Sequence, residues 1–484
     1  MVKYTEKDAS EKLTFSSISL SEVLRNELRL ESSLYNNEAH KYRQLINDGK
    51  WETMKLISHS GNQGFTTNAG YPGRFKRDYI SPSHKDAIGF IGSSEMLGID
   101  PKPQKFLSKQ TSAMTKCKVD LNTLLLSRSG TIGRTALVRN QLKNFLISEH
   151  SIRLLPNEYP GYIYTFLITE VGKKLVTTNT YGAVVDQVEP EHLFNIEVPN
   201  PDERLKRKID SMIIESYDLR DSSNTKLEEA ESLLLKALKL PYNPMELIER
   251  RNNSGIEFKH FDIKLSQHSE RLDASYHLPI IESILNKIGE NSESMVQLGD
   301  DTITSEIILP SRFKRVFVGK NFGTRLIGGK NVGELIPSNE KYLSNKIHEN
   351  KIREELGIRE NAIVITARGT IGKTMLAPKH FEEWAISDNL MQLVPTSEDI
   401  AGYLYIFLNS PYGYELITRN TYGGVVDALE VEHINKIPIP FLDNENTIAK
   451  INGLALEAKD ERFRAYQLEM EAVETFNKEV LGMM

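Results

Sequence analysis

The residues that could carry chemistry gather around two short glycine motifs. Gly372-Lys373-Thr374 has the sequence that ends a phosphate-binding loop. A Walker loop also needs a glycine five residues before its Gly-Lys pair, and that position holds Ala367. The related motif that begins at Gly130 has Arg134 where the Walker loop has its lysine. We therefore interpret both motifs as tight turns between strands, in which Gly130 and Gly369 supply a positive φ or a close backbone approach.

A basic residue follows each of these turns. Arg134 and Lys373 are expected at the tip, where each either reaches a phosphate or is an ordinary solvated cation. An enzyme acting on nucleotides through these turns would lose nucleotide binding on Lys373→Ala. We expect no such binding, because the Walker pattern is incomplete.

Two later motifs combine acids, histidines and a tyrosine. Residues 179–186 read NTYGAVVD and residues 420–427 read NTYGGVVD, and a Glu-His pair follows each at 191–192 and 432–433. Asp186 and Asp427 with these pairs could be metal ligands or an acid/base pair, but their place beside helix-capping positions favours capping and local salt bridges. Tyr181 and Tyr422 either stack and hydrogen bond or anchor their own loops, and we favour the anchor.

No group of side chains in the sequence predicts a catalytic centre. There is no Asn-Pro-Pro-Tyr or Asp-Pro-Pro-Tyr motif and no glycine-rich loop suited to S-adenosylmethionine. The expectation is a protein that recognises a partner, with no catalytic residue, no metal site and no cofactor of its own.

The two motif sets are copies of each other. The glycine motif recurs after 239 residues and the tyrosine motif after 241, so the spacing inside each copy is kept to within two residues. Arg74-Phe75-Lys76-Arg77 matches Arg312-Phe313-Lys314-Arg315, and ISEH at 147–150 matches ISDN at 386–389. A duplicated chain carries an internal pseudo-two-fold, which suits a partner with two related sites, such as duplex DNA or a pair of subunits.

Positive charge is concentrated at the same place in both copies. The whole chain of 484 residues has a net charge of −6. Residues 71–140 nevertheless hold 12 Lys and Arg against 5 Asp and Glu, and residues 311–380 hold 14 against 6. Each segment is either an ordinary solvated surface or a polyanion site, and its repetition favours the polyanion site.

The composition excludes several classes of protein. With 39% hydrophobic and 26% charged residues the chain resembles an ordinary soluble protein, and no run reaches the roughly 18 apolar residues of a spanning helix. The polar start MVKYTEKDASEK argues against export, and the single Cys117 excludes an intramolecular disulfide and a cysteine-built zinc site. We expect a cytoplasmic protein that does not enter a membrane.

Each copy is expected to mix strands and helices. Apolar runs at 124–126 and 362–365 predict strands before the glycine turns, and 135–138, 145–155 and 384–394 are also strand-like. Residues 162–176 and 403–417 have helical spacing of apolar residues and predict one helix each.

A long charged helix is expected after each copy. Apolar residues recur at steps of three, four and seven from Leu205 to Ala237 and from Ile448 to Val480. Some 35 helical residues would reach about 50 Å. We expect the helices to pack on each other as an antiparallel coiled coil more than on their own domains. The fold class is α+β, with two pseudo-symmetric mixed α/β domains at 1–200 and 256–440, a central helix at 201–240, a linker at 241–255 and a C-terminal helix at 441–484.

The residues resemble the specificity (S) subunits of type I restriction–modification systems. SRSGTIGR and TARGTIGK, ISEH and ISDN, YGAVVD and YGGVVD, and the closing EHI-to-IPIP segment occur in that order twice, each time followed by a long helix. The resemblance covers nearly the whole chain. It departs where His150 stands opposite Asn389, and where the usual Glu-Gln pair after the closing prolines is replaced by Asn444-Glu445-Asn446.

This resemblance implies a non-catalytic DNA-specificity subunit in a restriction–modification or related phage-defence system. Two target recognition domains would each contact one half of a split double-stranded DNA target, two DNA adenine methyltransferase (M) subunits would assemble on the chain, and motor-endonuclease (R) subunits would join for cleavage. The alternative is a stand-alone sequence-specific DNA-binding regulator, which would show high specific affinity as an isolated chain.

The DNA contacts are expected in the basic segments. Phosphate contacts would position the protein and side chains within 60–120 and 305–350 would read base edges. The predicted DNA-binding residues are Arg74, Lys76, Arg77, Arg134, Arg312, Lys314, Arg315 and Lys373.

Overall fold

A computed structural model describes residues 18, 20–25, 37–59, 61, 63–111, 113–178, 187–247, 271, 273–337, 341–422 and 427–483. The chain forms two compact units. Unit 1 comprises Met1–Asp218 with Gln467–Met484, and unit 2 comprises Leu219–Tyr466. The first NTYGAVVD motif with Tyr181 and Asp186, and the predicted linker beyond residue 247, lie outside the described residues.

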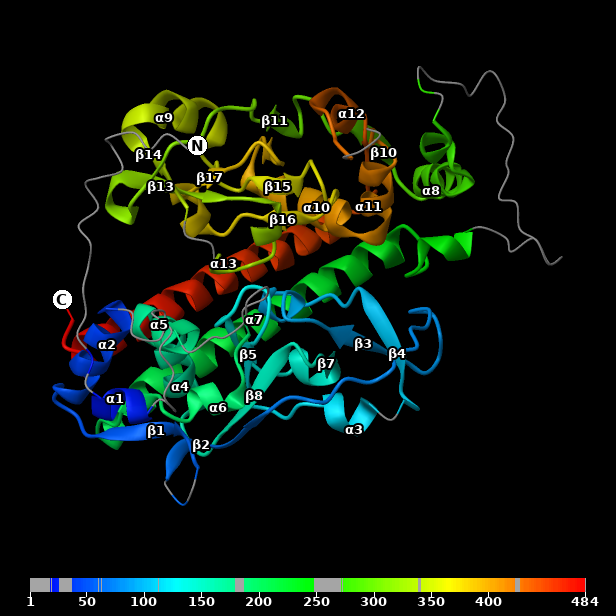
Figure 1. The fold of residues 1–484 in the computed structure, drawn as a ribbon. Helices are drawn as coiled ribbons and strands as arrows, with labels where there is room; N and C mark the ends of the chain where they lie inside the picture. The colour runs from blue at the N-terminus through cyan, green and yellow to red at the C-terminus, as the bar shows by residue number, and fades with distance from the viewer. Residues whose placement is uncertain are drawn as a thin grey trace, which may run out of the picture. The chain divides into compact units, whose positions relative to one another are not determined.

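Unit 1 is built on a six-stranded sheet with strand order β6-β5-β8-β2-β1-β9. Strands β1, β2, β5 and β8 of this sheet are labelled in Figure 1. Its strands are β1 (Thr53–Ile57), β2 (Gly64–Gly70), β5 (Leu124–Ser127), β6 (Thr135–Leu137), β8 (Ser151–Pro156) and β9 (Glu197–Pro199). β1 and β2 pair in parallel, and the other neighbours pair antiparallel. The predicted strands at 124–126 and 135–138 are confirmed. The continuous apolar run of β5 is fully buried, as expected for a strand covered on both faces.

A smaller sheet of three strands completes the β structure of unit 1. It has the order β4-β3-β7, with β3 (Ala87–Ile91), β4 (Lys105–Ser108) and β7 (Leu146–Ile147). The described helices of this unit are α1 (Leu20–Arg25), α2 (Asn37–Asn47), α3 (Ala113–Cys117), α4 (Pro160–Ile168), α5 (Glu170–Thr178) and α6 (Pro190–Leu193), followed by the first part of α7 (Glu203–Ala237).

Unit 2 repeats this plan, but its large sheet is divided. A four-stranded sheet has the order β11-β18-β15-β16, and β10 and β19 form a separate two-stranded ladder. These strands are β10 (Ser294–Gln297), β11 (Thr304–Ile308), β15 (Ile363–Thr366), β16 (Thr374–Leu376), β18 (Leu390–Pro395) and β19 (Pro438–Phe441). In unit 1 the corresponding six strands form one sheet, because β1 pairs with β2 as well as with β9.

The small sheet also recurs in unit 2. Its order is β12-β14-β13-β17, with β12 (Phe317–Val318), β13 (Gly323–Ile327), β14 (Tyr342–Ser344) and β17 (Ala385–Ile386). The helices are α8 (Pro279–Glu290), α9 (Asn345–Lys351), α10 (Glu398–Asn409), α11 (Pro411–Thr418), α12 (Val431–Asn435) and α13 (Glu445–Thr475), which continues into a π-turn at Phe476–Val480. Residues from Gln467 onward in this last segment belong to unit 1.

The single helices expected at 162–176 and 403–417 are wrong, because each is two helices that meet at a corner. Thr169 and Ser410 leave the helical conformation, and their hydroxyl oxygens each accept a hydrogen bond at 3.1 Å from the backbone N–H of Gly172 or Gly413. A Cβ on Gly172 would lie 2.0 Å from the Phe166 carbonyl oxygen, and one on Gly413 would lie 2.1 Å from that of Phe407. Only glycine fits this close backbone approach.

Each unit fastens a core helix to a long helix through the same contact. In unit 1 the backbone N–H of Gly161 in α4 donates to Asp210 Oδ1 of α7 at 2.7 Å. In unit 2 the N–H of Gly402 in α10 donates to Asn452 Oδ1 of α13, also at 2.7 Å. The next residue, Tyr162 or Tyr403, is buried and donates its hydroxyl to the carbonyl of the proline that closes the domain. The long helices therefore pack on their own units as well as on each other.

Within each unit the two long-helix segments are neighbours, and in unit 2 their ion pairs show that they run antiparallel. In unit 2, Lys226 of α7 pairs with Glu457 of α13, and Lys450 Nζ of α13 lies 2.9 Å from an oxygen of Glu229 in α7. The later residue of α7 therefore contacts the earlier residue of α13, as in an antiparallel pair. In unit 1, Lys208 Nζ lies 2.9 Å from Glu479. The predicted antiparallel helix pair is confirmed by the two ion pairs in unit 2, and the single ion pair in unit 1 shows that the helix segments are neighbours there as well. Among the described residues, no helix combines the length and apolar character needed to cross a membrane.

Candidate nucleic-acid interface

The glycine motifs form the predicted turns. Antiparallel strands β5 and β6 flank the first, and β15 and β16 flank the second. All four glycines have positive φ, at 80° and 79° for Gly130 and Gly133 and 86° and 87° for Gly369 and Gly372. A Cβ on Gly372 would also lie 2.9 Å from the Tyr414 ring, whereas the space beside Gly130 and Gly369 is open. The turns are fixed in shape by conformations that favour glycine.

The basic residues after these turns lie immediately before the second strand and not at the tip. The backbone N–H of Arg134 donates to Ser127 Oγ, and that of Lys373 donates to Thr366 Oγ1, both at 2.9 Å. The Lys373 side chain is exposed, and that of Arg134 is half-buried. The tips themselves are Gly130-Thr131 and Gly369-Thr370, which carry no charge.

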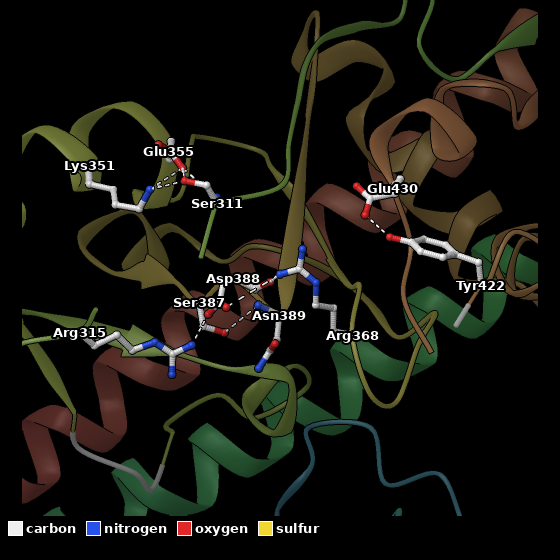
Figure 2. Close-up of polar contacts among 10 residues, drawn as sticks. All are labelled: Ser311, Arg315, Lys351, Glu355, Arg368, Ser387, Asp388, Asn389, Tyr422 and Glu430. Atoms are coloured by element: carbon white, nitrogen blue, oxygen red, sulfur yellow. Dashed lines mark hydrogen bonds and ion pairs between the residues drawn. The ribbon is translucent and has the colours of Figure 1, made fainter. Parts of the chain in front are cut away.

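The last arginine of each Arg-Phe-Lys-Arg segment pairs with a buried acid. Arg77 pairs with Glu149, which is 5% exposed, and Arg315 pairs with Asp388, which is 8% exposed. These acids are the third residues of the ISEH and ISDN motifs. In unit 2 a second arginine, Arg368, approaches the same carboxylate at 3.9 Å, and Figure 2 shows Arg315 and Arg368 on either side of Asp388. Much of the charge of Arg77 and Arg315 is therefore compensated within the protein.

The phenylalanine of each segment also faces the protein. Phe75 packs against the small buried cluster of Phe90, Leu107 and Leu146, and Phe313 packs against the cluster of Leu326, Leu343 and Ala385. In unit 2 the start of the segment is held as well, because Ser311 N donates to Glu355 Oε2 at 2.9 Å (Figure 2). Lys351 lies 2.8 Å from the same carboxylate, and its hydrogen bond holds the pKa of Glu355 below its usual value.

The remaining cations of the segments are exposed. Arg74, Arg312 and Lys314 have no hydrogen-bond or ion-pair partner among the described residues, and Lys76 has only an exposed contact of 3.3 Å to Asp78. An exposed pair of this kind contributes little and leaves the lysine free to bind elsewhere. In each Arg-Phe-Lys-Arg segment the phenylalanine and the last arginine therefore hold the backbone in place, and the first arginine and the lysine are exposed to solvent.

The residue after each buried acid is exposed and has a fixed backbone. In unit 2 the carbonyl of Asn389 accepts from the N–H groups of Ala367 and Arg368 at 2.9 and 3.2 Å, and the side-chain amide has no partner among the described residues. In unit 1 the carbonyl of His150 accepts from Arg128 N at 3.0 Å, and its Nδ1 lies 2.9 Å from Ser129 Oγ. Sequence reasoning did not single out these two as contact residues. A signal was available in the sequence, because the last residue of the ISEH and ISDN motifs changes from His150 to Asn389.

The tyrosine of the second NTYGGVVD motif is not a buried loop anchor. Tyr422 is 41% exposed and donates its hydroxyl to the Glu430 carboxylate, which raises its pKa above the ordinary value (Figure 2). In unit 1 the matching acid, Glu189, accepts a hydrogen bond from Tyr71 at 2.7 Å and pairs with Arg128. The two matching acids therefore each accept a hydrogen bond from a tyrosine, but the two tyrosines, Tyr71 and Tyr422, come from different positions in the repeat.

The Glu-His pair of unit 1 has a structural role, whereas the helix α12 that contains the second pair has no side-chain cap hydrogen bond. In unit 1 His192 Nδ1 accepts from Glu189 N at 3.2 Å, as part of a capping box at the start of α6. This confirms the expected capping role for that histidine. Across the described ranges, no three His, Cys, Asp or Glu side chains are arranged to hold a metal ion.

Comparison with known proteins gives weak similarities only. No family model and no curated protein matches the chain. Solved structures that it resembles include a type I restriction–modification S subunit from M. genitalium, with 14% identity over 90% of this chain and 96% of that chain and a TM-score of 0.29. Another is the HsdS subunit from Thermoanaerobacter tengcongensis, with 14% identity over 85% and 95% and a TM-score of 0.26.

A third similar structure comes from work on complex assembly and conformational transition of the type I R–M system. It is 14% identical over 84% of this chain and 94% of that chain, with a TM-score of 0.25. Because these TM-scores are low, the similarities say nothing about the function of this chain.

Proposed function

We propose that the chain is a non-catalytic DNA sequence-specificity subunit, in which each unit contacts one half of a bipartite double-stranded target. The observation that supports this most directly is the repeated Arg-Phe-Lys-Arg segment. Each copy fixes its backbone through a packed phenylalanine and an ion pair between a partly exposed arginine and a buried carboxylate, and each presents two further exposed cations. Cations presented from an irregular segment that is held in place in this way suit the regularly spaced phosphates of a duplex.

The concentration of charge supports the same partner. Segments 71–140 and 311–380 carry net charges of +7 and +8 in a chain whose net charge is −6. A basic surface on an acidic protein is the electrostatic pattern of a polyanion site, and its occurrence once in each unit fits a target with two halves. Arg74, Lys76, Arg312 and Lys314 would bind phosphates, Arg134 and Lys373 would add to the field, and Arg77 and Arg315 would mainly hold the segments in place.

The reaction would belong to partner subunits. We propose that two adenine methyltransferase subunits assemble on the chain, with motor-endonuclease subunits where the system cleaves, in the cytoplasm where the DNA lies. The domains of this assembly would be the recognition domains 1–200 and 256–440, the helices 201–240 and 441–484, and the linker 241–255. The long antiparallel helices support this division, because they pair in both units.

The proposal is tested by mapping methylated adenines in the genome of cells with the chain, without it, and with its 60–120 segment exchanged for that of another such protein. We expect a split methylated motif that disappears without the chain and changes in one half after the exchange. Co-purification with a methyltransferase is expected in parallel. A motif unchanged by the exchange contradicts the proposal, and specific DNA binding with no enzyme partner favours a stand-alone regulator.

A double variant tests the exposed cations without disturbing the fold of the segment. Arg312→Gln with Lys314→Gln removes the two exposed cations and leaves the anchors Phe313 and Arg315 in place. We expect weaker methylation at every occurrence of the motif with no change in its sequence, since phosphate contacts carry no base information. The matched control is Lys287→Gln in α8, whose lysine is 3.4 Å from Glu290 and lies outside the basic segment.

A further inference from the structure

Two large aromatic side chains are exposed at matching positions of the two small sheets. Tyr79 is 45% exposed and forms an antiparallel bridge with Leu107 of β4. Phe317 is 46% exposed and pairs antiparallel with Leu343 of β14. Because Lys105-Phe106-Leu107-Ser108 matches Lys341-Tyr342-Leu343-Ser344, the two rings occupy the same place in the repeat. The residue type differs, but the size and exposure are kept.

A lysine from the neighbouring strand lies against each ring. Lys105 Nζ is 5.3 Å from the centre of the Tyr79 ring, and Lys341 Nζ is 5.8 Å from the centre of the Phe317 ring. Both lysines are exposed, and neither has an ion-pair partner among the described residues. These distances fit a cation–π contact, which orders a lysine that would otherwise be free to rotate.

The surroundings of each pair point to one kind of partner. Both pairs lie inside the basic segments, and each ring is three and five residues beyond the two exposed cations of its Arg-Phe-Lys-Arg sequence. An aromatic ring kept in water among cations is poorly explained by folding, because burial would stabilise it. A nucleotide offers both matching surfaces, a phosphate for the lysine and an apolar sugar or base for the ring.

We propose that each aromatic–lysine pair, Tyr79 with Lys105 and Phe317 with Lys341, is a contact site for one nucleotide step of duplex DNA. This rests on the proposed function and adds where the small sheets touch the target. The lysine binds a phosphate, and the ring packs on the apolar surface of the adjoining sugar or base. The two pairs serve one half-site each, and the contact does not depend on the base sequence.

The test uses the full-length protein in the complex with which it purifies and a fluorescein-labelled duplex that carries the methylated motif. The dissociation constant is measured by anisotropy over a series of salt concentrations. Lys105→Gln and Lys341→Gln should each lower the slope of log affinity against log salt by about one, as expected for one lost phosphate contact. Tyr79→Leu and Phe317→Leu should each weaken binding about tenfold with the slope unchanged.

Two controls separate contact from folding. Tyr242→Leu removes another aromatic, 77% exposed and outside the basic segments, and should leave binding unchanged. Thermal unfolding of the variants should match the wild type, because the substituted rings are exposed. Binding by both leucine variants within twofold of the wild type overturns the inference.

A second duplex without the motif distinguishes this inference from the proposed function. Since the contact is independent of sequence, the variants should lose affinity for both duplexes alike. Loss on both duplexes supports the contact even if the wild type shows no preference for the motif, a result that would contradict only the proposed function. Loss on the motif alone overturns the sequence-independent contact and leaves the proposed function standing.

Discussion

In unit 1 the buried acid Glu149 meets one arginine, Arg77, whereas in unit 2 the matching Asp388 meets both Arg315 and Arg368. Counted from the glycine turn, the position of Arg368 is occupied in unit 1 by Ser129, which contacts His150 instead. The anchors that hold the basic segments are thus kept, while the exposed residues beside them change. Such a division suits two domains that use one frame to recognise two different partner sequences.

The largest expected effect concerns the helix corner that both units share. Gly413→Ala places a Cβ 2.1 Å from a backbone oxygen, and Gly172→Ala does the same in unit 1 at 2.0 Å. Each should lower the free energy of unfolding by about 3 kcal/mol or more, since backbone cannot yield as a side chain does. Urea unfolding measures this effect. Gly453→Ala in α13 is the control, because its Cβ would meet nothing within 4 Å and should stabilise by about 1 kcal/mol.

A pH effect is expected in unit 2 at a site that unit 1 lacks. Burial lowers the pKa of His380 to about 4, with its ring stacked on Tyr466 at 3.8 Å and Arg325 nearby. The unfolded histidine titrates near 6.5, so the folded state takes up its proton only at lower pH. The stability from the neutral ring is complete above about pH 6.5 and is lost as pH falls toward 4, in all about 3 kcal/mol.

The measurement is urea unfolding of wild type and His380→Gln from pH 7 to 4. Glutamine is the residue at the corresponding place in unit 1, Gln141. The variant should lose this part of the pH dependence even if it is less stable at pH 7. Parallel curves for the two proteins would show that His380 is not the titrating group.

Removing the buried acid should affect unit 2 more than unit 1. Asp388→Asn leaves Arg315 and Arg368 without their carboxylate, whereas Glu149→Gln affects Arg77 alone. We expect a loss of about 2 kcal/mol for Asp388→Asn, less than for a fully buried pair because the arginines are partly exposed, and a smaller loss for Glu149→Gln. Thermal unfolding measures both losses of stability. Equal losses for the two variants would show that Arg368 does not contribute to the ion pair with Asp388.

The smallest effect on stability, and the sharpest on recognition, is expected at the exposed residue after each acid. Asn389→Ala should leave unfolding unchanged and relax one position in one half of the methylated motif by about 1–3 kcal/mol, because an exposed asparagine amide can pair with an adenine edge. His150→Ala should change the other half only. Methylation mapping reports both, and a change in the same half from both variants would contradict the assignment of one unit to each half.

Much of the architecture was predictable from local patterns. The glycine turns, their flanking strands and the two long helices follow from short apolar runs, positive-φ glycines and helical periodicity. The helix corners at Thr169 and Ser410 were missed, although Pro411 stands where a new helix can begin. Apolar periodicity continues across such a corner when both helices bury their faces in the same core.

The candidate site was predictable only as a region. Its basic segments stand out by charge, but the ion pairs that divide anchors from exposed cations join residues 72 and 73 positions apart. No spacing rule predicts such pairs, and Tyr422, expected as a buried anchor, is exposed because Glu430 holds its hydroxyl at the surface. The exposure of Tyr79 and Phe317 likewise depends on which side of the small sheets faces solvent.

By itself the sequence determined that the chain is a duplicated α+β protein with paired basic segments and two long helices, because repetition, charge and periodicity are written along the chain. Only the tertiary structure decided which arginines are anchors and which cations are presented to a partner. The reason is physical. A charge becomes an anchor when folding brings a buried carboxylate to it, and that carboxylate comes from a distant strand end.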